Sequence, residues 1–384
     1  MYFYVDHTSR FERNTGVQRC VRSIATALID LGIPLRPVLW DWTDGGFLPA
    51  TPDRLEHLSR WNGPAVDAWA PTTFEPEQRS HPSDAWLMIV ELVNGADQLR
   101  WAADEVGLKV CWLFHDAIPV RWSHLYMERA DSMRDGHIVY MDGFAQFEAV
   151  VSNSRTTGEH LREHLQQRQL RHDHVQPLPL AEDFAGVDRL PPPTPHRDRS
   201  QRWQLLCVGS LELRKNHMAL FKALAWLKAL QRLPPHALTL VGWAKDPVVV
   251  EHCHRACAAG VRVRWECDAD DAQLLELYGQ SDFTVYPSLE EGFGLPVAES
   301  LWHRRICLCS DEGALGEISR QGGCALVNSH DWRSIAAALD RLFHDDAWRD
   351  QLQQQVEQRS FRSWRTYATE LLHTLKCPLE PAAS

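Results

Sequence analysis

The stretch Ser281–Ser300, SDFTVYPSLEEGFGLPVAES, carries the signals of a strand, a loop and a helix in that order. Asp282–Tyr286 is a short run of β-branched and aromatic residues, which is typical of a buried strand. Gly292 and Gly294 allow the loop to bend freely and to approach a ligand, and Pro296 suits the first turn of a helix. Because a helix start leaves backbone N–H groups without partners, this order predicts an anion-binding loop.

Two carboxylates flank that loop, with seven residues between them: Glu291 at its mouth and Glu299 one turn inside the helix. A carboxylate offers two acceptor oxygens, which suit the paired hydroxyls of a sugar or ribose. The stretch resembles the nucleotide-sugar site of family 4 glycosyltransferases, whose pattern is Glu, seven residues, Glu, with Gly-Phe-Gly-Leu-Pro between them. The resemblance extends over nearly all of 201–376 and implies the GT-B fold, an α/β architecture of two Rossmann-like domains that face each other across a cleft.

The resemblance also implies roles for residues of this stretch. Glu291 would be a catalytic residue that holds hydroxyls of the transferred sugar, and Glu299 would hold the ribose of the nucleotide. The N–H groups of Phe293, Gly294 and Leu295 would contact the diphosphate of the donor.

Composition narrows the class of protein. At 384 residues the chain is long enough for two domains, and 44% hydrophobic with 24% charged residues is ordinary for a soluble globular protein. A net charge of −11 disfavours nucleic-acid binding. No apolar run approaches the roughly 20 residues that span a bilayer, and the first ten residues do not resemble a signal peptide. We therefore expect a cytoplasmic protein whose cysteines are reduced.

The first half begins with alternating strand and helix signals. Tyr2–Asp6 is a predicted strand, apolar residues follow at helical spacing to a helix end near residue 32, and Leu35–Leu39 is a second strand. This order predicts a parallel unit whose ligands bind at the carboxyl ends of the strands. Gly16, at the start of the helix, resembles the family's glycine facing the donor diphosphate, although it also suits a simple helix start. Arg19 is either a phosphate or acceptor contact or a solvated helix residue.

Residues 43–83 are rich in Pro, Gly, Asp and Thr and are predicted to be a loop insertion that lines the acceptor site. Strand patterns return at Ala85–Val90 and Lys109–Phe114. His115, directly after the second of these strands, resembles the family's histidine that contacts the donor sugar near the acceptor. Asp116 would orient either that imidazole or the acceptor.

A proline-rich segment separates the two halves. We predict an N-terminal Rossmann-like acceptor domain at 1–183, a stiff linker at 184–200 and a nucleotide-sugar-binding domain at 201–359. In the GT-B fold the last helix, here 360–376, packs back on the first domain.

A second candidate loop follows the predicted strand Trp203–Val208 and reads GSLELRKNH. Arg214 and Lys215 would neutralise a diphosphate, and more strongly as negative charge builds on its departure. The segment resembles the family's diphosphate-binding loop, in which many members have Arg where Ser210 stands. In relatives with Glu-Pro-Arg-Lys-Asn the arginine equivalent to Arg214 carries that charge, so Ser210 is assigned to the donor site with Arg214 and the catalytic Lys215.

Three further residues are helix-cap candidates. Ser154 is expected to cap the helix that follows SNSRTT. Asp268 and Asp270 precede another helix, where they either contact the base, as the resemblance suggests, or cap the helix. We assign no aspartate pair to a metal-bound diphosphate. We therefore expect neither a metal ion nor another cofactor.

The resulting hypothesis is a retaining, metal-independent glycosyltransferase that moves mannose from GDP-mannose to a glycan or lipid-linked oligosaccharide in bacterial surface polysaccharide or lipopolysaccharide assembly. Peripheral contact with the inner face of the cytoplasmic membrane is part of that expectation. Donors such as dTDP- or GDP-rhamnose or a UDP-sugar stay open. So do a GT-B isomerase or glycogen-type synthase and a non-catalytic nucleotide-sugar-binding scaffold.

Overall fold

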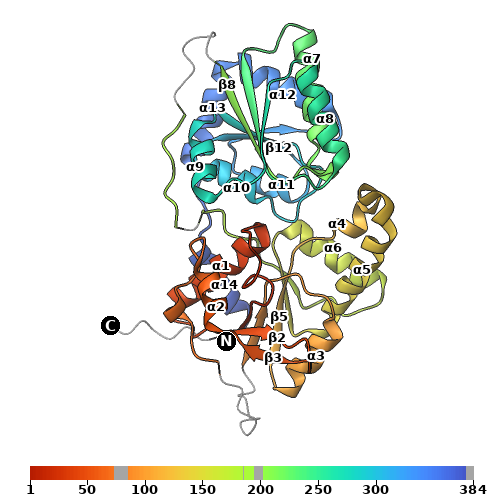
Figure 1. Cartoon of the computed structure of the whole chain (residues 1–384), viewed down its shortest axis with the longest axis vertical. Coiled ribbons are helices and arrows are strands. Elements are labelled where there is room, and N and C mark those ends of the chain that lie inside the picture. Colours follow the sequence, from red (N-terminus) through yellow and green to blue (C-terminus); the bar gives the residue numbers. More distant parts are fainter. Residues whose placement is uncertain (73–84, 185, 194–201, 378–384) are drawn as a thin grey trace. The chain divides into compact units, whose positions relative to one another are not determined.

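The computed structural model describes residues 1–72, 85–184, 186–193 and 202–377 (Figure 1). The described residues of Met1–Ala181 and Arg362–Ser384 form one compact unit, unit 1, and those of Glu182–Phe361 form a second, unit 2. The end of the predicted insertion, residues 73–83, and residues 185 and 194–200 of the predicted linker lie outside the described residues.

Unit 1 is built on a sheet in the order β3-β2-β1-β4-β5-β6-β7, in which β3 alone among the described strands runs antiparallel to its neighbour. Its strands are β1 Tyr2–Tyr4, β2 Arg36–Trp40, β3 Phe47–Pro49, β4 Trp86–Ile89, β5 Lys109–Phe114, β6 Ala149–Ser152 and β7 Val175–Pro177. The middle strands are buried on both faces, as expected for a parallel sheet covered by helices.

The helices of unit 1 are α1 Gly16–Asp30, α2 Pro52–Ser59, α3 Ala96–Glu105, α4 Ile118–Arg121, α5 Ala130–Gly143, α6 Arg155–Gln167 and α14 Trp364–Thr374. Trp112 on β5 is fully buried and stacks edge-on or tilted against Tyr140, Phe144 and Phe147, which forms the aromatic centre of this core. Figure 1 shows α14, from the far end of the chain, beside α1, against which it packs.

Unit 2 has a wholly parallel sheet among its described strands, in the order β10-β9-β8-β11-β12-β13. The strands are β8 Trp203–Val208, β9 His236–Val241, β10 Val263–Glu266, β11 Phe283–Tyr286, β12 Ile306–Ser310 and β13 Cys324–Val327. The helices are α7 His217–Ala229, α8 Pro247–Ala258, α9 Asp271–Gln280, α10 Leu295–Trp302, α11 Gly313–Ser319, α12 Trp332–His344 and α13 Asp346–Gln358.

Each sheet reverses its strand order once, and this determines where a ligand site is expected. In unit 1 the chain proceeds outward from β1 in one direction and then restarts at β4 on the other side of β1; in unit 2 the same happens at β8 and β11. The loops that leave two such strands at their carboxyl ends diverge, which opens the position where doubly wound sheets bind ligands. In unit 2 these are the β8–α7 and β11–α10 loops, the two that the sequence singled out.

One sequence prediction about secondary structure is wrong, and one helix was missed. Residues 43–83 are not one long loop, because their described part forms β3, which pairs with β2, and the helix α2. Helix α13 was not predicted at all. It is rich in Gln and buries only Leu352 and Val356, so its apolar stripe is too narrow to stand out in the sequence. None of the helices among the described residues is long and apolar enough to cross a membrane.

Candidate functional site

The β8–α7 and β11–α10 loops of unit 2 are joined by hydrogen bonds. Asn216, the residue before α7, has a left-handed backbone with φ of 61°, which asparagine tolerates better than most residues. Its side-chain amide donates to the carbonyl of Pro287 at 3.2 Å and to that of Ser329 at 2.7 Å. The Leu289 N–H donates to the Arg214 carbonyl at 2.8 Å. These bonds keep the charged side chains of the two loops together.

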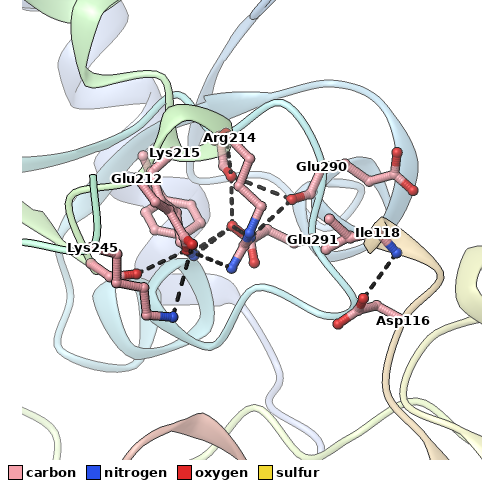
Figure 2. Close-up of polar contacts among 11 residues, drawn as sticks. Asp116, Ile118, Glu212, Arg214, Lys215, Lys245, Glu290 and Glu291 are labelled. Carbon is pink, nitrogen blue, oxygen red and sulfur yellow. Dashed lines mark hydrogen bonds and ion pairs between the residues drawn. The ribbon is translucent and has the colours of Figure 1, made fainter. Parts of the chain in front are cut away.

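The centre of the site is Glu291, one carboxylate oxygen of which contacts two cations and two hydroxyl groups (Figure 2). Its Oε1 lies 2.6 Å from Lys215 Nζ and 2.8 Å from Arg214 Nη1. The same oxygen accepts hydrogen bonds from Ser288 Oγ at 2.5 Å and Tyr286 OH at 2.9 Å. Lys215 also donates to the Tyr286 hydroxyl. The structure therefore brings together Arg214, Lys215 and Glu291, which the sequence placed on separate loops.

Electrostatics keep Glu291 ionised. Burial alone would raise the pKa of its carboxyl group, but Arg214 and Lys215 outweigh burial and hold that pKa well below its usual range. A carboxyl group with such a pKa carries no proton to give at neutral pH. Glu291 can thus accept hydrogen bonds from hydroxyl groups or stabilise positive charge, and it is unsuited to act as a general acid.

Helix α10 starts beside these side chains, with Leu295 as its first residue. Gly294 has φ of 111°, and a Cβ atom there would lie 2.4 Å from Leu315 Cδ2, so both backbone and space require glycine. Phe293 is buried. Glu299, one turn further, is buried and accepts a hydrogen bond from Tyr278 OH at 3.0 Å. The predicted bond of Glu299 to the ribose stays a prediction.

A second acid, Glu212, extends the cluster away from Glu291. Its Oε1 lies 2.9 Å from Arg214 Nη2 and accepts a hydrogen bond from Ser210 Oγ at 2.8 Å. Its Oε2 lies 3.8 Å from Lys245 Nζ. The guanidinium group of Arg214 is thus held between Glu212 and Glu291. Ser210, predicted to contact the donor, uses its hydroxyl to hold Glu212.

In unit 1, His115 follows β5 and is buried. Its Nε2 lies 2.5 Å from the Val90 carbonyl, so Nε2 carries the proton and donates it. Burial lowers the pKa of His115, although the Val90 bond and Asp116 oppose that effect, and the ring is neutral at pH 7 with Nδ1 as an acceptor. The Asp116 carboxylate accepts from the Ile118 N–H at 2.9 Å. The Val90 carbonyl, rather than Asp116, fixes the His115 ring through Nε2, and the other role predicted for Asp116, orientation of the acceptor, stays a prediction.

The other candidates of unit 1 lie on α1. Gly16 is its first residue, and Arg19 lies one turn further with a part-buried side chain. Their predicted contacts with phosphate or acceptor stay predictions. Glu91 was not predicted as a site residue. It follows β4, is fully buried, and accepts hydrogen bonds from the N–H groups of His7 at 2.8 Å and Thr8 at 2.5 Å. A lone acid after a strand carries no distinctive spacing.

Asp270 caps α9 rather than standing free for a ligand. Its side chain accepts from the Gln273 N–H, and the Gln273 side chain accepts in return from the Asp270 N–H, which forms a capping box. Asp268 accepts from the Trp243 indole at 3.1 Å. Within the part of the chain that the structure describes, no group of three or more His, Cys, Asp or Glu side chains is placed to hold a metal ion.

The fold and the site together define a class of protein. It has two doubly wound units, and in one of them a basic loop contacts an ionised acid where the strand order of the sheet reverses. Residues 193–359 match the family described as Glycosyl transferases group 1, and this part of the chain is a domain of that family.

Two curated proteins of Escherichia coli are similar to this chain. An O-antigen chain mannosyltransferase B is 29% identical over 179 residues, 45% of this chain and 46% of the relative. A serotype-specific mannosyltransferase WbdA is 25% identical over an alignment of 406 residues that covers 98% of this chain and 44% of the relative. The chain therefore spans a little under half the length of these relatives.

Solved structures show the same fold along the whole chain. Sucrose-phosphate synthase from Thermosynechococcus elongatus aligns with a TM-score of 0.67 at 17% identity, and Anabaena Alr3699/HepE in complex with UDP and glucose with 0.64 at 16% identity. Each alignment covers 98% of both chains. The two Rossmann-like units therefore have the GT-B architecture that the sequence predicted.

Proposed function

We propose that this protein is a retaining glycosyltransferase that moves mannose from GDP-mannose to a glycan or lipid-linked oligosaccharide in bacterial surface polysaccharide assembly. The observation that carries the proposal is the contact of Lys215 with the ionised Glu291 at the reversal point of unit 2. The group 1 domain supports the reaction class, and the similarity to O-antigen and serotype-specific mannosyltransferases supports the sugar and the pathway class.

The basic loop suits the leaving group of this reaction. As the bond between the anomeric carbon and the phosphate oxygen breaks, the diphosphate gains negative charge and the sugar ring gains positive charge. Lys215, Arg214 and the first N–H groups of α10 stabilise the former, because they are fixed before the reaction. The acceptor oxygen bonds to the anomeric carbon on the same face, and its proton passes to the departing phosphate oxygen. No side chain serves as a covalent nucleophile.

The acids and the histidine bind hydroxyl groups in this scheme. Glu291 accepts from the sugar, and its negative charge opposes the growing positive charge of the ring. Glu299 accepts from the ribose. His115 presents an unprotonated Nδ1 as an acceptor for a hydroxyl, since its Nε2 hydrogen is committed to Val90. All charge compensation comes from side chains and backbone, so we propose metal independence, and the rate is expected to be unchanged by EDTA.

Ligand-induced thermal stabilisation tests the donor. A ligand that binds only the folded protein raises Tm according to its affinity. At equal concentration, GDP is expected to raise Tm more than UDP or dTDP, and GDP-mannose with an oligosaccharide acceptor should yield an α-mannoside when the donor is α-linked. A larger shift with UDP or dTDP would redirect the proposal to a UDP-sugar or dTDP-rhamnose, and transfer from GDP-rhamnose in place of GDP-mannose would correct the sugar alone.

The product distinguishes the remaining alternatives. An epimerised nucleotide sugar without a new glycoside would indicate an isomerase, and extension of an α-glucan would indicate a glycogen-type synthase. Donor binding without turnover on a panel of lipid-linked and free oligosaccharides would indicate a non-catalytic scaffold. Peripheral contact with the inner face of the cytoplasmic membrane stays a prediction. Fractionation of cells that produce the protein would test it.

A further inference from the structure

The charged side chains clustered around Arg214 neutralise one another. Arg214 and Lys215 supply two positive charges, and Glu291 and Glu212 supply two negative charges at distances between 2.6 and 2.9 Å. A nucleoside diphosphate carries at least two negative charges at the phosphates. A neutral cluster of side chains offers it hydrogen bonds but no net charge, so one more cation beside the N–H groups of α10 would balance the phosphates.

Lys245 is placed to supply that charge. It lies on the loop after β9, the neighbour of β8 in the sheet, and the Leu211–Ala244 bridge continues the pairing of these two strands beyond their ends. The Lys245 N–H donates to the carbonyl of Leu211, the residue before Glu212, at 3.1 Å. This bond holds the backbone of Lys245 beside the loop that carries Glu212. A Cβ at Gly242 would lie 2.4 Å from the Gly209 carbonyl oxygen, which shows how closely the two loops approach.

The side chain of Lys245, in contrast, is loosely held. Its Nζ lies 3.8 Å from Glu212 Oε2, beyond hydrogen-bond distance, and the side chain is 57% exposed, against 10% for Lys215 and 19% for Arg214. An exposed pair of this kind contributes little stability and separates easily. Glu212 keeps Arg214 and Ser210 as partners when Lys245 leaves. Figure 2 shows this chain of contacts from Lys245 through Glu212 to Arg214 and Glu291.

We propose that Lys245 is a further phosphate-binding residue of the donor site, which pairs with Glu212 in the ligand-free protein and moves to the diphosphate when the donor binds. This inference rests on the function proposed above. It adds the charge of Lys245 to those of Arg214 and Lys215, which Glu212 and Glu291 neutralise in the ligand-free protein. The long, flexible lysine side chain suits this exchange, since it acts as a mobile point charge.

Calorimetric titration of the Lys245→Met variant tests the proposal. We expect about a tenfold loss of affinity for GDP, the size of one charge-assisted contact, and no change for guanosine, which has no phosphate. The difference between variant and wild type should shrink in 0.5 M NaCl, because an exposed charge is screened. Lys245→Arg should restore most of the affinity. Lys222→Met, at an exposed lysine on α7 of the same unit, is the matched control and should bind GDP like wild type.

Equal GDP affinity for Lys245→Met and wild type would overturn the proposal, and so would an equal loss for GDP and guanosine, which indicates distortion of the fold. If the wild-type protein does not bind GDP, the titration is repeated with UDP and uridine or with dTDP and thymidine, so that each nucleotide is compared with its own nucleoside. Absence of binding for all three by wild type would overturn the proposed function itself, and this inference with it. The wild-type titration therefore separates the two failures.

Discussion

The reversal points of the two sheets are built alike but carry opposite electrostatics. In both units an acid follows the second strand and binds the loop that follows the first: Glu91 binds backbone N–H groups after β1, and Glu291 binds two cations after β8. Burial raises the pKa of Glu91 to about 7 despite its hydrogen bonds to Thr8 and His7. The pKa of Glu291 is held well below its usual range.

The difference shows what each acid can do. Glu91 is buried where its donors are neutral, so its own charge is costly and its value lies in fixing the β1–α1 loop. Glu291 has cations that remain charged at neutral pH, so it stays an anion beside a positive loop. The same topological position thus serves as a structural tie in unit 1 and as a candidate reaction centre in unit 2.

The largest expected effect is loss of activity from unit 2. Glu291→Gln and Lys215→Ala should each lower kcat by about 10²–10³-fold, the range for removing one fixed charge at a transition state. Glu276→Gln, at an exposed glutamate of α9, is the matched control and should transfer sugar at the wild-type rate. The measurement is initial rate with saturating GDP-mannose. Normal turnover by Glu291→Gln would show that the charge of Glu291 has no part in the reaction.

Many of the site residues of unit 2 could be predicted from the sequence, whereas Glu91 of unit 1 could not. The strand, glycine loop and helix start around Glu291 are local signals, and β8 was predicted with the bounds that the structure gives it. The contact of Lys215 with Glu291 joins residues 76 positions apart, and its pairing depends on β8 lying beside β11. Glu212 and Lys245 are ordinary surface residue types until the loops fold. Glu91 has no spacing signal, because its partners are backbone groups.

The next effect is on stability and has opposite sign in the two units. The raised pKa of Glu91 means that its contribution is fully present below about pH 4.5 and is lost as pH rises through about 7; the shift corresponds to about 3 kcal/mol. The depressed pKa of Glu291 means that its contribution is present above its ordinary pKa and is lost only in strong acid. Between pH 5 and pH 8, unit 1 should therefore weaken relative to unit 2.

Hydrogen exchange of β1 and β4 peptides from pH 5 to pH 8, corrected for the intrinsic rate, measures this. In Glu91→Gln the pH dependence should vanish, at the expense of lower stability at pH 5, since the amide has one acceptor oxygen for two N–H groups. Glu105→Gln, at an exposed residue of α3, should keep the wild-type profile. A wild-type profile in Glu91→Gln would show that another group causes the pH dependence.

A smaller effect on activity is expected in unit 1. His115→Phe keeps a ring but removes the Nδ1 acceptor, and we expect a fall in kcat/KM of about 10–100-fold, within the range of one hydrogen bond to a reacting group. His115→Asn, which retains a side-chain acceptor, should lose less. The control for folding is protection of the β5 amides. Full activity of His115→Phe would show that His115 is not needed for transfer and that the reaction depends on the residues of unit 2.

The smallest effects concern helix caps, one in each unit. Ser154 is buried, accepts from the Thr157 N–H at 3.1 Å and donates to Thr157 Oγ1 at 2.8 Å, whereas the Asp270 capping box on α9 is exposed. Ser154→Ala should cost about 1–2 kcal/mol and Asp270→Ala about 0.5–1 kcal/mol, because an exposed helix start regains water as a partner.

Hydrogen exchange of the first turns of α6 and α9 reports these losses locally, without assuming that the two units unfold together. The Ser154→Ala variant should accelerate exchange at the start of α6 alone, and the Asp270→Ala variant at the start of α9 alone. Equal acceleration at both starts in one variant would mean that the units open as one. In that case the different electrostatics of Glu91 and Glu291 would act on a shared stability, and the opposite pH trends of the two units would merge.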